Sequence, residues 1–135
     1  RNGVTRVESA EELYKTCDYI SLHIPATEKY KKFVDRHLLE SLPKGAIVVN
    51  TARKEVINEE DLVAVLGERE DLKYATDIAA ACQAELNEKY GNRVFATPKK
   101  QGAETAEANY NAAKAAAEQI VDFFVNGNRK YQVNK

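Results

Sequence analysis

The sequence predicts an α/β fold, in which a parallel sheet flanked by helices forms one half of a larger doubly wound domain. Short apolar runs rich in β-branched residues alternate with helical patterns along the chain, as in parallel sheets with crossover helices. Four such runs are present, which is too few for a complete doubly wound domain. We therefore expect an incomplete sheet.

The first predicted elements are a short helix and a strand. Ser9 is a helix-capping residue with Glu12 three positions later, and this pattern predicts a helix that ends near Thr16. Residues 18–24 alternate between apolar and polar side chains and are followed by Pro25, which predicts a strand.

Turn signals separate the next elements. Residues 27–33 are polar and rich in lysine, and they predict a helical turn on the surface. Asp35 predicts the cap of a short helix over residues 36–42. A Pro-Lys-Gly turn then leads into a strand over residues 46–50.

The remainder of the chain continues this alternation. Asn58, with Asp61 three residues later, predicts the start of another helix. The further expected elements are a strand over 72–78, a helix over 83–89 that ends at Gly91, a strand over 93–97 and an alanine-rich helix over 103–126 that stops at Gly127. Residues 129–135 are expected to be extended.

Composition excludes several classes of protein. The chain has 135 residues, a net charge of −1, 44% hydrophobic and 30% charged residues, which indicates one globular domain without a basic surface for nucleic acid. No apolar run approaches the roughly 20 residues of a membrane-spanning helix, and no signal peptide is recognised. Cys17 and Cys82 show neither metal-ligand spacing nor a disulfide pattern. We expect a cytoplasmic protein with no metal, membrane or nucleic-acid partner.

Arg53 is the first candidate for a functional residue. It follows the strand over 46–50 directly, and ligands of α/β sheets bind at the carboxyl ends of strands. A guanidinium group binds a carboxylate with two parallel hydrogen bonds. The alternative is a surface arginine in a loop without a binding role.

Four motifs together resemble the D-isomer-specific 2-hydroxyacid dehydrogenases. They are SLHIPAT over residues 21–27, PKGAIVVNTAR over 43–53, TDI over 76–78 and TPKKQGA over 97–103, in the order and spacing of the family. Within the family, residues 9–126 are most similar to D-3-phosphoglycerate dehydrogenases. The glycine-rich GxGxxG fingerprint of the family is absent from the chain, and we expect it upstream.

The resemblance implies a Rossmann-like NAD-binding domain over residues 1–126, present only in its second half, and a tail over 127–135 that returns towards a substrate domain. It implies NAD-dependent oxidation of a D-2-hydroxyacid, or reduction of the matching 2-ketoacid. With 3-phosphoglycerate this would be the first step of serine biosynthesis. We expect a homodimer as the full-length protein. The chain alone is expected to be inactive and to bind a dinucleotide poorly, because it lacks the pyrophosphate cradle.

The resemblance also implies roles for individual residues. Arg53 would hold the substrate carboxylate, and Asp77 would contact the nicotinamide end of the cofactor, with a loop-capping aspartate as the alternative. The further cofactor-binding positions are His23, Pro25, Thr27, Thr51, Ala52 and Gly102. For His23, packing or a supporting contact is an equal alternative. Lys54 replaces a glycine common in the family, so its backbone has to avoid positive φ or carry strain.

The acid–base position departs from the family pattern. The family has Thr-Pro-His-x-Gly, whereas this chain has one more residue between Pro98 and Gly102, and lysines in place of the histidine. Counting from Gly102 assigns the base to Lys100, and counting from Pro98 assigns it to Lys99. We favour Lys100, because the glycine opens the long helix, and Lys99 stays open. One of the two is expected to be a solvated lysine.

A lysine base needs a pKa lowered from about 10.4 towards neutrality. Burial and a neighbouring positive charge such as Arg53 lower it. The family has a supporting glutamate five residues after the aspartate, and Cys82 occupies that position here. A carboxylate would raise the pKa of a lysine, so we interpret the two replacements as one coupled change. Glu85 is an alternative source of a carboxylate.

Two other functions remain open. The chain could belong to an enzyme for another D-2-hydroxyacid or 2-ketoacid. It could also be a non-catalytic homologue that acts as a dinucleotide-binding or interaction module, because both the histidine and the glutamate are replaced. A dehydrogenase assay separates these alternatives.

Overall fold

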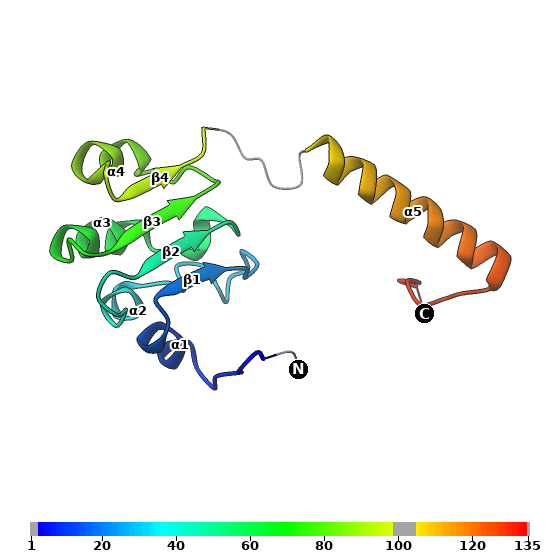
Figure 1. Cartoon of the computed structure of the whole chain (residues 1–135), viewed down its shortest axis with the longest axis horizontal. Helices are drawn as coiled ribbons and strands as arrows, with labels where there is room; N and C mark the ends of the chain where they lie inside the picture. Colours follow the sequence, from blue (N-terminus) through cyan, green and yellow to red (C-terminus); the bar gives the residue numbers. More distant parts are fainter. Residues whose placement is uncertain (1–2, 99–104, 135) are drawn as a thin grey trace. The chain divides into compact units, whose positions relative to one another are not determined.

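A computed structural model of the chain describes residues 3–98 and 105–134. The chain divides into two compact units, Arg1–Lys100 and Gln101–Lys135, and each is described by itself. The elements of the first unit are α1 (Ala10–Thr16), β1 (Tyr19–Leu22), α2 (Arg36–Glu40), β2 (Ile47–Asn50), the 3₁₀ turn η1 (Lys54–Val56), α3 (Glu59–Glu68), β3 (Lys73–Thr76), α4 (Gln83–Tyr90) and β4 (Val94–Ala96) (Figure 1).

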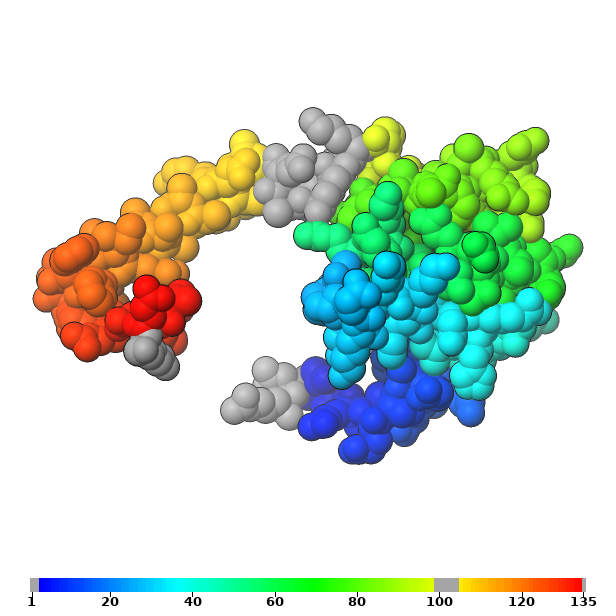
Figure 2. All heavy atoms as spheres, turned by 180° about the vertical axis from the view of Figure 1, so that it is seen from behind, coloured from blue at the N-terminus to red at the C-terminus, as the bar shows by residue number. Residues whose placement is uncertain are grey.

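The four strands form one parallel sheet in the order β1-β2-β3-β4. The α/β prediction is confirmed. Each strand lies beside the next one in the chain, and Figure 2 shows the same succession at the surface, from the blue helix α1 to the yellow-green end of the unit. Crossovers between parallel strands are right-handed, so a sheet that grows in one direction receives α2, α3 and α4 on one face.

Burial along the strands confirms that one face of the sheet is covered. The residues that point into the core from successive strands are Ile20, Leu22, Val48, Asn50, Tyr74, Thr76 and Val94, all at most 7% exposed. The alternate positions include Tyr19 and Phe95, which are 73% and 62% exposed. The core therefore lies between the sheet and the helices, as in one half of a doubly wound domain.

Local side-chain contacts explain where the helices begin. The Ser9 hydroxyl accepts the Glu12 N–H at 3.1 Å, and the Asp35 carboxylate accepts the Leu38 N–H at 3.1 Å, as the sequence predicts. Helix α3 also begins after Asn58, but the side chain of this residue does not cap it. The Asn58 amide donates instead to the Asp61 carboxylate at 2.8 Å.

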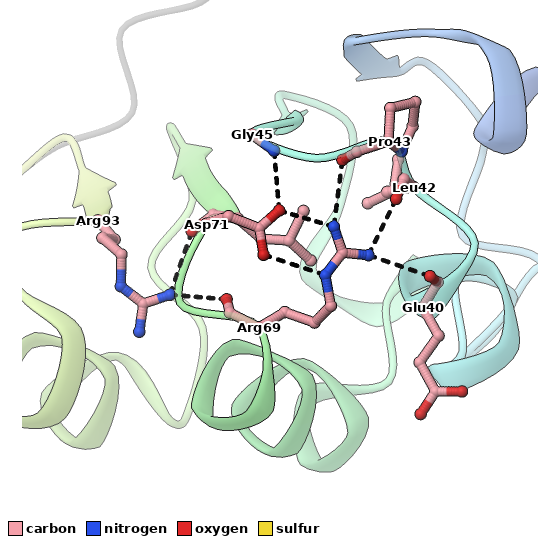
Figure 3. Close-up of polar contacts among 8 residues, drawn as sticks. Glu40, Leu42, Pro43, Gly45, Arg69, Asp71 and Arg93 are labelled. Atoms are coloured by element: carbon pink, nitrogen blue, oxygen red, sulfur yellow. Dashed lines mark hydrogen bonds and ion pairs between the residues drawn. The ribbon is translucent and has the colours of Figure 1, made fainter.

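Arg69 joins two connections at the amino ends of the strands (Figure 3). Its guanidinium donates to both carboxylate oxygens of Asp71, at 3.1 and 2.7 Å, and to the carbonyl oxygens of Glu40, Leu42 and Pro43, at 3.1, 2.9 and 3.2 Å. The Asp71 carboxylate also accepts the N–H of Gly45, which has a φ of +80° in the turn before β2. The segments that lead into β2 and β3 are thus joined by hydrogen bonds.

The second unit contains helix α5 (Ala106–Asn126). The Thr105 hydroxyl caps it by accepting the Ala108 N–H at 3.1 Å, and Gly127 ends it with a φ of +66°, as predicted. The predicted extended tail is wrong at its start, because the Gln132 N–H bonds the Arg129 carbonyl at 3.1 Å and closes a turn. Asn128 favours this turn by accepting the Lys130 N–H. Across residues 3–98 and 105–134, no helix is long and apolar enough to cross a membrane.

Candidate functional site at the carboxyl ends of the strands

The carboxyl ends of the strands lie level with one another along one edge of the sheet (Figure 1). The register pairs Leu22 with Asn50 and Asn50 with Thr76, the last residues of β1, β2 and β3. The residues that follow these strands, His23, Thr51 and Asp77, therefore leave the sheet at the same edge. Parallel sheets bind ligands at this edge.

A pocket of about 400 Å³ opens between the ends of β1 and β2. It is lined by His23, Ile24, Pro25, Ala26, Thr51, Ala52 and Arg53. The structure thus brings together five of the residues that the sequence singled out. Thr27 is absent from the lining. Its carbonyl oxygen instead accepts the N–H groups of Tyr30 and Lys31, both at 2.9 Å, in the predicted surface turn.

His23 has an exposed side chain among the residues that the structure describes. Its Nε2 lies 2.8 Å from the Ser21 hydroxyl on the same edge of β1. This contact holds the ring beside the pocket that His23 lines.

Arg53 presents an exposed side chain from a fixed backbone. Its Nη1 donates to the Ala52 carbonyl at 2.9 Å, and its backbone is extended, with φ −149° and ψ 148°. Lys54 begins the turn η1, and the only non-glycine residue with positive φ within residues 3–98 and 105–134 is Lys32. The replacement of glycine by Lys54 is therefore accommodated without a left-handed backbone.

Asn50 is a site residue that sequence reasoning missed. Its side chain is buried between β2 and β3, with 1% of the residue exposed. The Oδ1 atom accepts the Ala52 N–H at 3.1 Å, and Nδ2 donates to the Arg53 carbonyl at 3.0 Å. The Tyr74 hydroxyl lies 3.3 Å from Nδ2. A polar residue that ends an apolar strand run is the signal that identifies such a position.

Backbone hydrogen bonds hold Asp77 at the same edge of the sheet. Its N–H donates to the Asn50 carbonyl at 3.4 Å, and its carbonyl accepts the Thr97 hydroxyl at 3.3 Å. The carboxylate atom Oδ1 is buried and accepts no hydrogen bond from the described residues. A buried carboxylate oxygen without a donor is costly, so this atom is suited to an N–H group of a ligand.

The segment proposed to carry the base starts at this edge. The Thr97 N–H donates to the Thr76 carbonyl at 3.0 Å, and Pro98 follows. Lys99, Lys100 and Gly102 lie outside the described residues.

Cys82, at the position of the family glutamate, lies before α4 and is partly buried. The Glu59 carboxylate accepts the backbone N–H groups of Ala81 and Cys82, at 3.1 and 3.2 Å. Burial, and then the Glu59 charge, raise the pKa of the Cys82 thiol to about 11. Glu85, the alternative carboxylate, forms an exposed ion pair with Lys89 at 2.7 Å within α4. No cluster of three or more metal-binding side chains occurs in the described part of the chain.

Comparisons with known proteins agree with this architecture. Residues 1–111 match the profile of the family described as "D-isomer specific 2-hydroxyacid dehydrogenase, NAD binding domain". The chain is 36% identical over 119 residues to a D-3-phosphoglycerate dehydrogenase of Methanocaldococcus jannaschii, which covers 87% of the chain and 22% of that protein. It is 39% identical over 74 residues to a D-lactate dehydrogenase of Staphylococcus aureus, which covers 55% of the chain and 22% of that protein.

A solved structure resembles almost the whole chain. The NAD⁺-bound 3-phosphoglycerate dehydrogenase of Entamoeba histolytica is 49% identical, with a TM-score of 0.80 over 98% of this chain and 44% of that one. The chain therefore spans less than half the length of these three relatives.

Proposed function

We propose that this chain forms part of an NAD-dependent D-2-hydroxyacid dehydrogenase. The chain belongs to the D-isomer specific 2-hydroxyacid dehydrogenase family, whose NAD-binding domain it matches over residues 1–111. The observation that carries the proposal is the edge of the sheet where neighbouring strands end. An exposed arginine and a pocket lie there, together with a buried carboxylate oxygen that accepts no hydrogen bond from the described residues.

Arg53 is proposed to bind the substrate carboxylate. Its side chain is exposed beside the pocket, while its backbone is fixed by Asn50, so the guanidinium is available for two parallel hydrogen bonds. Such a contact orients the carbon that loses hydride and polarises the neighbouring oxygen.

Asp77 and the pocket residues are proposed to contact the nicotinamide end of NAD, which accepts the hydride when bound. The Oδ1 atom of Asp77, which has no hydrogen-bond partner within residues 3–98 and 105–134, fits this role, because the nicotinamide carboxamide carries N–H donors. His23, Pro25, Thr51 and Ala52 supply a pocket wall at the adjacent strand ends, whereas Thr27 and Gly102 are proposed from the resemblance alone. The chain contains no glycine-rich pyrophosphate loop, so it supplies one side of a dinucleotide site.

Lys100, or Lys99 in the alternative alignment, is proposed to take the proton of the substrate hydroxyl. A neutral amine is needed for this step, and the positive charge of Arg53 would favour it. In an intact enzyme that carries this chain, Lys100→Ala and Lys99→Ala identify the base. The true base gives a loss in kcat that external methylamine partly restores, and the other lysine gives little change.

The proposed substrate is D-3-phosphoglycerate, and the reaction would then lead to serine in the cytoplasm, with a homodimeric enzyme. Two of the relatives described above carry this activity in their names, and the third supports D-lactate as the alternative. The kcat/KM values for D-3-phosphoglycerate, D-glycerate and D-lactate with NAD would rank these substrates. Light scattering would give the mass of the enzyme in solution.

The decisive test of the function compares Arg53→Ala with Arg6→Ala, a change at an exposed arginine outside the site. Loss of the carboxylate contact is expected to lower kcat/KM on the order of 10²–10³-fold. Arg6→Ala should be neutral. Absence of turnover with all three D-hydroxyacids would favour the non-catalytic module, and full activity of Arg53→Ala would exclude the proposed role of Arg53.

A further inference from the structure

We propose that Asn50 is a positioning residue for Arg53 and that it sets the affinity of the site for the substrate carboxylate while leaving affinity for the dinucleotide unchanged. The inference rests on the proposed function of Arg53. Asn50 touches neither ligand in this proposal, because its side chain is buried beneath the turn over residues 51–53.

The Asn50 carboxamide uses both of its ends on that turn. Oδ1 accepts the Ala52 N–H at 3.1 Å, and Nδ2 donates to the Arg53 carbonyl at 3.0 Å. These bonds fix the peptide groups on both sides of the Arg53 amide. Arg53 is thereby held in its extended backbone conformation, and its Nη1 reaches the Ala52 carbonyl of the same turn.

The neighbouring strand fixes the carboxamide itself. The Tyr74 hydroxyl, on a residue that is 2% exposed, lies 3.3 Å from Nδ2. The Thr76 hydroxyl donates to the main-chain carbonyl of Asn50 at 2.8 Å and accepts the Ile78 N–H at 3.1 Å, which fixes the backbone of the same residue. The arginine turn is thus attached to the ends of two strands, and its geometry exists before a substrate binds. Such preorganisation increases affinity by reducing the entropy lost on binding.

Only a side chain with one donor and one acceptor can make both bonds. An ionised aspartate at position 50 keeps the acceptor for Ala52 but places a negative oxygen against the Arg53 carbonyl. A protonated aspartate restores the donor. Because the site is buried, the pKa of that carboxyl group would be raised, which brings the change into an accessible pH range.

The test uses Asn50→Asp, Asn50→Leu and Tyr74→Phe in an intact enzyme that carries the chain. For Asn50→Asp at pH 9, KM for the hydroxyacid should rise roughly tenfold relative to the wild type, while KM for NAD stays within twofold. The ratio to the wild type should return towards one as pH falls to 6. Asn50→Leu should lack this recovery, and Tyr74→Phe should change KM for the hydroxyacid less than threefold, since it leaves both bonds to the turn intact. If Asn50→Leu does not fold, the pH dependence of the hydroxyacid KM in Asn50→Asp still tests the positioning role.

The double variant Arg53→Ala/Asn50→Asp separates this inference from the proposed function. Positioning predicts that Asn50→Asp adds no further loss of hydroxyacid binding once Arg53 is removed. An equal rise in both KM values, or an additive double variant, would overturn the positioning role. If Arg53→Ala alone were fully active, the proposed role of Arg53, on which this inference rests, would fail instead.

Discussion

The Glu59 carboxylate at the start of α3 accepts the backbone N–H of Cys82 at 3.2 Å, so two helix N-termini share one acidic side chain. The Ala81 N–H donates to the second carboxylate oxygen at 3.1 Å. The segment between β3 and α4 is therefore fixed by a residue from the preceding helix. It also means that a carboxylate lies next to position 82, although Cys82 itself carries no charge at neutral pH.

Removal of the Glu59 charge is expected to make the Cys82 thiol more acidic. Burial and, after it, the Glu59 carboxylate raise the pKa of Cys82 to about 11, so Glu59→Gln should lower this pKa while the effect of burial remains. The measurement is the pH dependence of alkylation by iodoacetamide in a Cys17→Ser background, where Cys82 is the one remaining thiol.

Glu60→Gln is the matched control, because Glu60 is the adjacent carboxylate and has no hydrogen bond to the residues that the structure describes. In Glu60→Gln, the pH dependence of Cys82 alkylation should match that of the parent protein. Equal shifts in both variants would mean that the general negative charge of α3, and not the Glu59 contact, controls the thiol.

Arg69→Lys should destabilise the first unit. The guanidinium contacts Asp71, the carbonyl oxygen of Glu40 at the end of α2, and two carbonyl oxygens of the following connection, and a single ammonium group cannot reach all of them (Figure 3). We expect a loss of about 1–3 kcal/mol in the free energy of unfolding, measured with urea.

Arg36→Lys is the control for this change. Arg36 pairs with Glu40 and Glu68, both at 2.5 Å, but these side chains are exposed. Exposed pairs contribute little, so the loss should be clearly smaller than that for Arg69→Lys. Similar losses for the two arginines would show that Arg69 acts only as a surface ion pair.

Asp71 makes the stability depend on acid pH. The Arg69 guanidinium, and then the Gly45 N–H, hold the pKa of Asp71 well below its ordinary value. A lowered pKa in the folded state means that the contribution is complete above the unfolded pKa of about 3.9 and is lost as pH falls towards the folded value. The wild type should have a higher urea midpoint than Asp71→Asn at pH 6. The difference between the two proteins should be smaller at pH 3. A constant difference would contradict the linkage.

Most of the elements could be predicted because their signals are local. Ser9, Asp35 and Gly127 each mark a helix boundary through contacts within a few residues, and all three boundaries are confirmed. The strands are shorter than predicted, with β1 covering Tyr19–Leu22 within the predicted 18–24. Strand ends depend on pairing with a neighbour, and an apolar pattern does not contain that information.

The site was predictable where it follows from strand ends and was missed where it depends on contacts between elements. Arg53 and Asp77 stand directly after apolar runs, and both leave the sheet at the same edge. Glu59 acts on Ala81, 22 residues away, and no local pattern specifies such a partner. Asn50 binds the nearby Ala52 and Arg53, but the Tyr74 hydroxyl beside its Nδ2 belongs to a residue 24 positions away. The roles of Lys99 and Lys100 stay predictions from the motif.

Lys32 offers a stabilising substitution in the surface turn. It has a φ of +52°, a conformation that costs about 1–2 kcal/mol for a residue with a Cβ atom. Its N–H donates to the Glu55 carbonyl at 2.8 Å, and this bond keeps the backbone in that conformation. Lys32→Gly removes the steric cost and adds roughly 0.5–1 kcal/mol of chain entropy loss, so a net gain of about 0.5–1 kcal/mol is expected.

Lys31→Gly should have the opposite sign and is therefore the control. Lys31 is also exposed and lies in the same turn, but its φ is not positive, so glycine brings only the entropic loss of roughly 0.5–1 kcal/mol. Urea unfolding of the two variants in parallel measures the difference. If both glycines destabilise the protein equally, the left-handed backbone at Lys32 carries no strain.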